Sequence, residues 1–210
     1  MKYEIEYKHN IKDFEDVWHI EEKYFEPSTI ASIEQVINWD NKNNDINIFV
    51  RDKDANKIVG EITLLPLSKR QFNKFMNNEL EDTEINENTL LDYKDGSKYY
   101  LCYSAIAIDY TYRDDKLVLG LLLKGLYDKL NYLKNRRIVF LNMCAEGQTL
   151  DGQKFVENFL NLKCKKITKD GYKLYSFIDE HDFENWFKVF PQYIRNYIDK
   201  FKLKIDLWEK

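Results

Sequence analysis

The feature that most constrains this chain is a long apolar strand followed at once by a long amphipathic helix. Residues 98–112 are rich in aromatic and β-branched side chains, and their centre at 105–108 is wholly apolar. Such a composition is typical of a strand buried on both faces of a sheet. In residues 116–134, leucines recur every three or four positions, which is the spacing of one helical face. These segments predict a central strand that leads directly into a helix packed on the sheet.

The remaining sequence predicts a mixed α/β order around this unit. Alternating apolar residues indicate strands, and apolar residues at helical spacing indicate helices. Strands are predicted at 3–8, 46–51, 57–67, 137–144, 164–168 and 172–178, and helices at 11–25, 30–39 and 149–160. The second and third strands, and the last two, are each separated by a short polar turn and therefore predict β-hairpins.

The length of 210 residues suits one α/β domain with a sizeable core. We expect residues 1–180 to form this domain, with the polar stretch 68–97 as an insertion or mobile flap. Residues 181–210 are rich in aromatic side chains at helical spacing. They predict a helical C-terminal extension that is packed on the same domain and broken at Pro191.

Composition argues against several classes of function. Lys and Arg total 32 against 36 Asp and Glu, so the chain lacks the basic surface of a nucleic-acid binder. The start of the sequence lacks a signal-peptide pattern, and the sequence holds no apolar run long enough to cross a bilayer. The three cysteines are widely spaced, as expected for thiols that stay reduced and form no disulfide framework. We expect a cytoplasmic protein that does not bind membranes. The three histidines are far apart, and no metal site is expected.

A local sequence within the central unit points to a family. Residues 104–113 read Ser-Ala-Ile-Ala-Ile-Asp-Tyr-Thr-Tyr-Arg. This run resembles the fourth strand of the GNAT superfamily of acyl-CoA N-acyltransferases, where the strand enters the cofactor-binding turn. The predicted order of elements over residues 3–178 is also similar to that superfamily. The resemblance implies a mixed, mostly antiparallel sheet flanked by helices, and acetyl-CoA as the co-substrate.

The resemblance also implies where the cofactor would lie. Exposed N–H groups at a helix N-terminus are suited to hold a pyrophosphate. The family pattern Q/R-x-x-G-x-G/A aligns with six residues, of which the arginine matches and the two small residues do not: Arg113, Asp114, Asp115, Lys116, Leu117 and Val118. The backbone of Ile106, Ala107 and Ile108 would pair with the amide arm of the cofactor, and Asn142 in the next strand completes the expected cofactor-binding set.

The altered turn leaves two interpretations open. Asp114 and Asp115 can cap the helix themselves and repel a polyphosphate. Lys116 places a cation in the same turn, and backbone N–H groups donate whatever the side chain. The sequence therefore supports both a working and a degenerate cofactor site.

Acyl transfer to an amine needs a base for the amine and an acid for the departing thiolate. The resemblance places Ser104 where many relatives carry a carboxylate base. Glu61 is the only charged residue inside the apolar strand 57–67 and could act through a water molecule, although an outward-facing carboxylate is the alternative. Tyr172 could supply the acid, or it could simply pack in the core. An acyl-cysteine route through Cys144 is a further alternative.

The leading hypothesis is therefore an N-acetyltransferase that transfers acetyl from acetyl-CoA directly to a small-molecule or peptide amine. The alternative is a GNAT-fold binding or regulatory module without catalysis. The acidic run at 79–87 could attract a cationic acceptor such as a polyamine, or it could be a solvated loop. The aromatic series in the C-terminal extension could form a homodimer contact, or it could cover the core.

Overall fold

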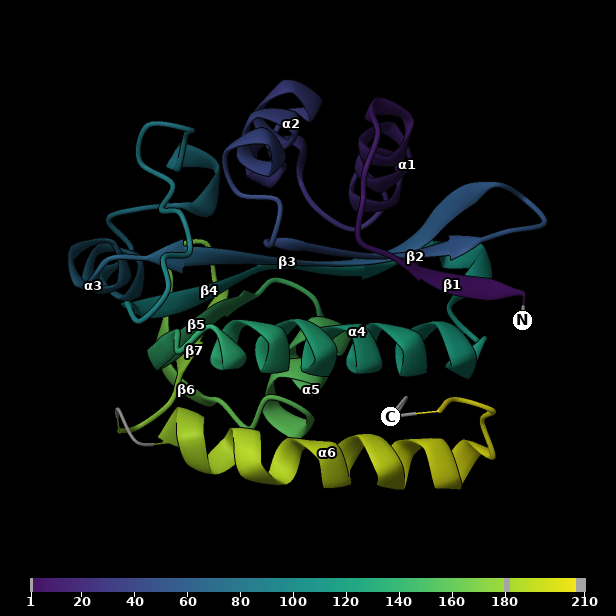
Figure 1. Ribbon diagram of the computed structural model, residues 1–210. Coiled ribbons are helices and arrows are strands. Elements are labelled where there is room, and N and C mark those ends of the chain that lie inside the picture. Colours follow the sequence, from purple (N-terminus) through teal and green to yellow (C-terminus); the bar gives the residue numbers. More distant parts are fainter. Residues whose placement is uncertain (1, 180–181, 207–210) are drawn as a thin grey trace.

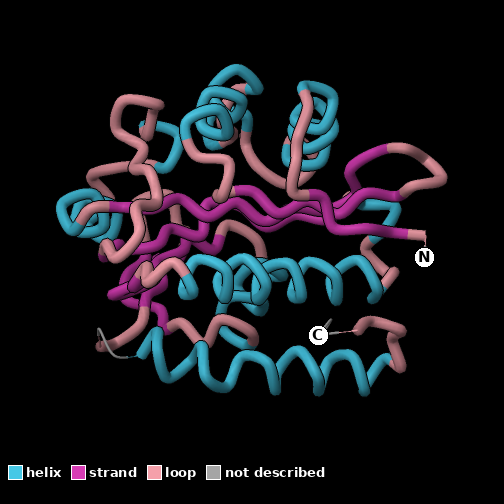
Figure 2. Tube along the Cα trace, viewed as in Figure 1, coloured by secondary structure: helices cyan, strands magenta, loops and turns pink. Residues whose placement is uncertain are grey.

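The computed structural model describes residues 2–179 and 182–206. Within this part of the chain, seven strands form one sheet in the order β1-β2-β3-β4-β5-β7-β6 (Figures 1 and 2). Their bounds are β1 Tyr3–Glu6, β2 Asn47–Asp52, β3 Lys57–Leu67, β4 Lys98–Ile108, β5 Val139–Gly147, β6 Lys163–Ile167 and β7 Lys173–Ser176. Neighbouring strands are antiparallel except for the parallel pair β4–β5. The predicted mixed, mostly antiparallel sheet is confirmed.

Helices cover both faces of the sheet. Figure 1 shows α1 and α2 on one face, α4 and α5 on the other, and α6 beyond α4. The α-helices span α1 Ile11–Glu21, α2 Ile33–Lys42, α3 Lys69–Asn77, α4 Lys116–Asn135, α5 Leu150–Asn158 and α6 Asp182–Phe201. Short 3₁₀ turns lie at η1 Pro27–Thr29, η2 Asp82–Glu84 and η3 Tyr110–Tyr112. None of the described helices has the length and apolar character needed to cross a membrane.

The predicted central unit is present as β4 and α4. The strand ends at Ile108, four residues before the predicted end, because Asp109 starts a tight turn. Its carboxylate accepts hydrogen bonds from the N–H and hydroxyl of Thr111 and pairs with Lys57 Nζ at 3.0 Å. Such side-chain bonds to the following backbone favour turns over strands. The chain is thereby directed from β4 into α4.

Helix α4 lies unusually close to the sheet at Gly125. A Cβ atom built at this position would lie 2.6 Å from Ile48 Cγ2 on β2. The leucine face around it is fully buried, as Leu122, Leu126 and Leu130 show. A larger residue at position 125 would push the helix away from β2 and open a gap in this core.

The segment 68–97 is packed into the core. It carries α3, whose Phe72 and Phe75 are buried, and then Ile85 and Leu90, which are buried as well. Trp39 in α2 donates from its indole nitrogen to the carbonyl of Ile85 at 2.6 Å. These contacts are those of an insertion that forms part of the domain, rather than of a free flap.

Helix α6 runs without a break through Pro191, so the predicted interruption was wrong. A proline removes one helical hydrogen bond. On both sides of it, however, Trp186, Phe190 and Ile194 are buried, and this packing outweighs the missing bond. The helix ends at Phe201, where Lys202 adopts a left-handed φ of 52°. The prediction extended to Trp208, which lies outside the described residues.

Candidate active site

Two irregularities of β4 coincide at Ser104. The pairing of β4 with β5 stops after Tyr103 and Ala145, and β4 then continues alone on this side to Ile108. The register with β3 shifts between Thr63 and Leu64, which leaves Ser104 as an extra residue. A bulge of this kind re-aims side chains and commonly lies beside an active site. The strands therefore diverge where β4 also bends.

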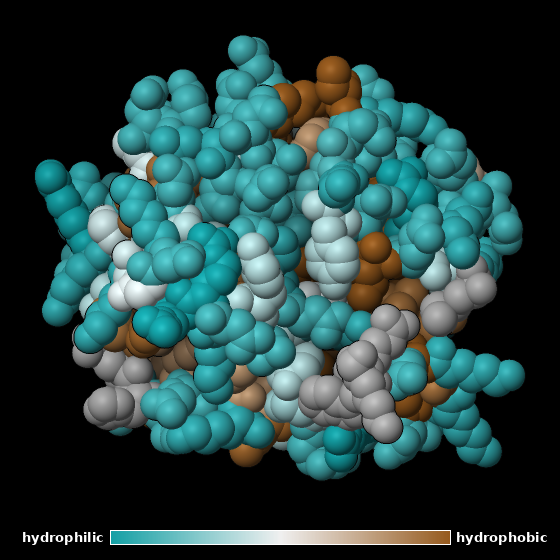
Figure 3. All heavy atoms as spheres, viewed as in Figure 1, coloured by the Kyte–Doolittle hydropathy of each residue, from teal (hydrophilic) through white to brown (hydrophobic). Residues whose placement is uncertain are grey.

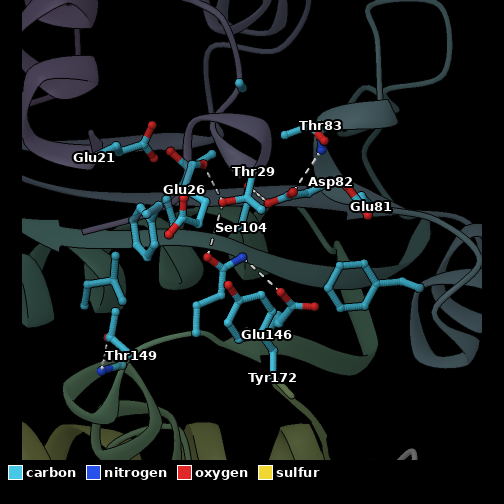
Figure 4. Close-up of a pocket in the computed structure, with 18 of the residues that line it drawn as sticks. Glu21, Glu26, Thr29, Glu81, Asp82, Thr83, Ser104, Glu146, Thr149 and Tyr172 are labelled. Carbon is cyan, nitrogen blue, oxygen red and sulfur yellow. Dashed lines mark hydrogen bonds between the residues drawn. The ribbon is translucent and has the colours of Figure 1, made fainter. Parts of the chain in front are cut away.

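A cavity of about 420 Å³ lies at this divergence, a size typical of small-molecule sites. Its walls come from the end of α1, the insertion, β3, β4, the end of β5, α5 and the β6–β7 turn. Figure 4 shows side chains from these elements pointing toward a common space. Of the predicted residues, the structure brings together Glu61, Ser104, Ile106 and Tyr172 in the lining.

Glu61 is the most unusual residue of the cavity. It lies opposite Ala107 of β4 in the sheet and is only 1% exposed, and its Oε1 has no hydrogen-bond partner. The outward-facing alternative is thus wrong. Burial, and then the nearby carboxylate of Glu21, raise the pKa of Glu61 well above 4.5. A buried carboxyl group with a raised pKa is suited to accept or donate a proton during a reaction.

Further carboxylates around the cavity have raised pKa values. Burial, with repulsion from Asp82, raises the pKa of Glu21 to about 8. Burial also raises the pKa of Asp82, although the hydroxyl of Ser104 donates to its Oδ2 at 2.5 Å and opposes this shift. Burial raises the pKa of Glu146 in the same way. No local sequence pattern marks Glu21 or Glu146 as a functional residue.

The lining is strongly acidic and lacks a described Lys, Arg or His. Seven carboxylates from five parts of the chain contribute, namely Glu21, Glu26, Glu61, Glu81, Asp82, Glu146 and Asp170. Figure 4 shows several of them distributed over opposite walls rather than gathered at one point. Among the described residues, no group of three or more His, Cys, Asp or Glu is arranged to hold a metal ion.

Tyr172, the nearby Tyr175 and Cys144 differ in their access to the cavity. Tyr172 lines the cavity, as Figure 4 shows. Tyr175 is fully buried, and its hydroxyl donates to Glu157 at 2.9 Å. Cys144 is also fully buried, lies opposite Cys102 across β4–β5 and is not part of the lining. Tyr172 therefore remains as a candidate acid, whereas the acyl-cysteine route lacks access to the cavity.

In the turn expected to hold the pyrophosphate, the side chain of Asp115 already binds the N-terminus of α4. Asp115 is the N-cap of α4, where its Oδ1 accepts the N–H of Leu117 at 3.0 Å and its Oδ2 accepts the hydroxyl of Tyr3 at 2.6 Å. The side chain of Val118 is fully buried and would contact any Cβ placed at Gly60. The N–H group of Leu117 is thus already satisfied by a carboxylate.

Other expected cofactor residues also have partners. Arg113 forms an ion pair with Asp151 at the start of α5. The hydroxyl of Tyr24 donates to the carbonyl of Ile108 at 2.8 Å. In the same turn Asp114 is exposed and Lys116 is half-buried, and Ala107 is buried on the α1 face. This part of β4 is therefore less open than the resemblance implied.

Asn142 was predicted as a cofactor residue, and the structure gives it a different role. It lies opposite Tyr100 in the paired part of β4–β5, before the strands diverge. Its Oδ1 accepts the N–H of Met143 at 2.7 Å and the N–H of Phe177 at 3.1 Å. Asn142 therefore ties the end of β7 to β5, away from the cavity.

Comparison with known proteins agrees with this architecture. No family model and no curated protein matches the sequence. Solved structures do match: Ard1 from Thermoplasma volcanium has a TM-score of 0.53 at 12% identity, with 84% of this chain and 95% of that chain covered. A chain of the NatC complex bound to Gag peptide and CoA has a TM-score of 0.53 at 12% identity, with 84% and 96% covered. The loading GNATL domain of CurA from Lyngbya majuscula has a TM-score of 0.52 at 13% identity, with 86% and 98% covered.

At this level of identity the likeness establishes the fold. The chain has the GNAT acyltransferase fold, with β4 and β5 diverging at the position of the cavity. What this particular chain acts on is not given by the fold, because one fold can support many sites. The side chains of the cavity carry that part of the argument.

Proposed function

We propose that this protein is an N-acyltransferase that transfers an acyl group, with acetyl as the first candidate, from acyl-CoA to an amine. The observation that carries the proposal is the position of Glu61. Its carboxyl group lies beside the divergence of β4 and β5, is buried, and has an oxygen without a partner. A buried carboxyl group with a raised pKa is suited to take the proton that an attacking amine must lose.

The proposed chemistry needs no covalent enzyme intermediate. The lone pair of the amine nitrogen attacks the thioester carbonyl, the C–S bond breaks, and the sulfur leaves with the electron pair. The amine proton passes to Glu61, directly or through water, and Tyr172 donates a proton to the departing thiolate. The protein contributes mainly by holding both reactants in position. Backbone N–H groups of β4 beyond Ser104 are the candidates for binding the amide arm of the cofactor.

A second candidate is a GNAT-fold binding module that does not use CoA. The specific observation behind it is the turn before α4, where Asp115 occupies the helix N-terminus and Arg113 is paired with Asp151. A polyphosphate would have to compete with a carboxylate that is already bonded there. This candidate keeps the acidic cavity as a ligand site and abandons acyl transfer.

Thermal melting separates the two candidates. A ligand that binds only the folded protein raises the melting midpoint. Acetyl-CoA and CoA at millimolar concentration should raise it if the protein is an acyltransferase, and the absence of any shift would favour the binding module. Adenosine diphosphate at the same concentration is the control for binding by the nucleotide alone.

Release of free thiol from acetyl-CoA tests the chemistry itself. The rate should depend on an added amine and should fall at least a hundredfold in Glu61→Gln, since general base catalysis typically contributes about 10²–10⁴. Glu79→Gln is the matched control, because Glu79 is an exposed carboxylate outside the cavity lining. Equal loss in both variants, or no loss in Glu61→Gln, would remove Glu61 from the mechanism.

A further inference from the structure

The acidic side chains of the cavity have no basic partners among the described residues. Several buried or half-buried carboxylates elsewhere do pair with cations, as Asp13 does with Arg51 at 2.6 Å and Asp45 with Lys129 at 2.9 Å. Within the described part of the chain, none of the seven cavity carboxylates forms an ion pair. A cationic ligand bound in the cavity would supply the positive partner that these side chains lack.

Glu61 indicates where in the cavity a ligand would bind. A buried carboxyl oxygen without a hydrogen-bond donor is costly, and native structures seldom retain one without a reason. Its neighbours on the same face of the sheet, Thr63 and Ala105, line the cavity but provide no positive charge. An ammonium group at this position would supply both the missing donor and the missing charge.

The remaining carboxylates indicate more than one positive charge on the ligand. Glu21 lies near Glu61, and Asp82 lies near Glu21, whereas Glu146 and Asp170 come from the end of β5 and the β6–β7 turn. Figure 4 places Glu146 on the wall opposite Glu21 and Asp82. An elongated cation with charges at both ends can contact carboxylates on both walls at once.

We infer that the ligand of this cavity is a linear aliphatic diamine or polyamine, one of whose amino groups is the acyl acceptor. The inner amino group lies beside Glu61 and the divergence of β4 and β5. The outer ammonium group is held by the carboxylates of Glu146 and Asp170. This inference rests on the proposed function for the acceptor role, and on the cavity alone for the class of ligand.

The reaction of such a ligand balances with acyl-CoA as the only co-substrate. The inner ammonium group loses one proton, attacks the thioester and loses a second proton as the amide forms. The products are an N-acyl polyamine, free CoA thiol and one released proton. Because acylation removes one positive charge, the product matches the acidic cavity less well than the acceptor does, which favours its release.

Isothermal titration without any cofactor tests the ligand class directly. The probes are spermidine, putrescine and n-butylamine, with magnesium chloride as a control for simple charge screening. Spermidine and putrescine should bind at least tenfold more tightly than n-butylamine, and magnesium should not displace them at equal ionic strength. Equal affinity for putrescine and n-butylamine would overturn the inference.

Charge-matched variants locate the site. Asp170→Asn lies on an exposed turn, so the fold should tolerate it, and Glu146→Gln changes the cavity wall. Each should weaken spermidine at least threefold while leaving n-butylamine unchanged. Glu79→Gln removes the same charge outside the cavity and should leave both affinities unchanged. Equal weakening in Glu79→Gln would mean that general surface charge, rather than this cavity, attracts the polyamine.

The two proposals fail separately. Spermidine binding without thiol release from acetyl-CoA would leave the cation site intact and remove the acyltransferase function. Thiol release that proceeds equally well with n-butylamine and putrescine would support the acyltransferase and overturn the polyamine inference.

Discussion

The substitution Glu61→Gln should change the stability of the protein by an amount that depends on pH. Glutamine keeps the shape of the side chain and removes its ability to ionise. Glu61 is 1% exposed and has an oxygen without a partner, so its charged form is strongly disfavoured in the folded protein. Burial is the main cause of its raised pKa, and the carboxylate of Glu21 adds to it.

The magnitude follows from proton linkage. In the unfolded chain, Glu61 ionises near its ordinary pKa of 4.5. Between this value and the higher folded pKa, the folded protein holds an extra proton, so its stability falls as pH rises, by about 1.4 kcal/mol per pH unit. This loss should continue from pH 5 upward until the pH passes the folded pKa of Glu61. The Gln variant lacks that loss.

Urea denaturation at pH 5, 6 and 7 measures the effect. The free energy of unfolding of Glu61→Gln relative to wild type should increase steadily over this series. Glu79→Gln, an exposed carboxylate, should show a nearly constant difference. If the difference for Glu61→Gln is the same at all three values of pH, Glu61 ionises normally in the folded protein, and the argument from its burial is refuted.

Three further substitutions test other parts of the structure. Tyr103→Phe should leave the free energy of unfolding unchanged or raise it by about 1 kcal/mol in urea denaturation, because the buried hydroxyl has no hydrogen-bond partner; a loss of more than 1 kcal/mol would contradict this. Asp151→Asn should release Arg113 and strengthen CoA binding severalfold in a melting titration, whereas unchanged binding would show that the pair does not compete with the cofactor. Trp186→Ala should cost about 3–5 kcal/mol in urea, because the indole is 2% exposed and donates to the carbonyl of Phe159; a cost below 1 kcal/mol would mean that α6 adds little to the core.

Much of the architecture could be predicted because its signals are local. The leucine spacing of α4 and the apolar run of β4 each favour one element over a short stretch of sequence. Asn161, which follows α5, adopts a left-handed φ of 55°, a conformation that asparagine tolerates. Pro191 misled the prediction, because a local rule for helix breaking does not include the packing of Trp186 and Phe190.

The candidate site could be predicted only in part. Glu61 was identified from its position in a strand, Ser104 from the resemblance and Tyr172 from its place in the last predicted hairpin, and all three line the cavity. Asn142 was placed in the cofactor set by its strand, although its amide oxygen is used within the sheet. No sequence pattern could assign a role to Glu21, because Glu21 acts on the pKa of Glu61, which lies forty residues further along the chain.

The sequence by itself determined most of the order of elements, the unit of β4 and α4, and the altered turn that follows Arg113, since each depends on residues that are adjacent along the chain. Helix α3 is the exception, because it lies in a stretch for which no helix was predicted. Tertiary structure decided which carboxylates share a cavity. Charges separated by many residues affect one another only when folding brings them together in a medium of low dielectric constant. The strand and helix that reveal the fold therefore say little about the ligand, and the acidic cavity beside them, assembled from distant segments, carries the proposal for function.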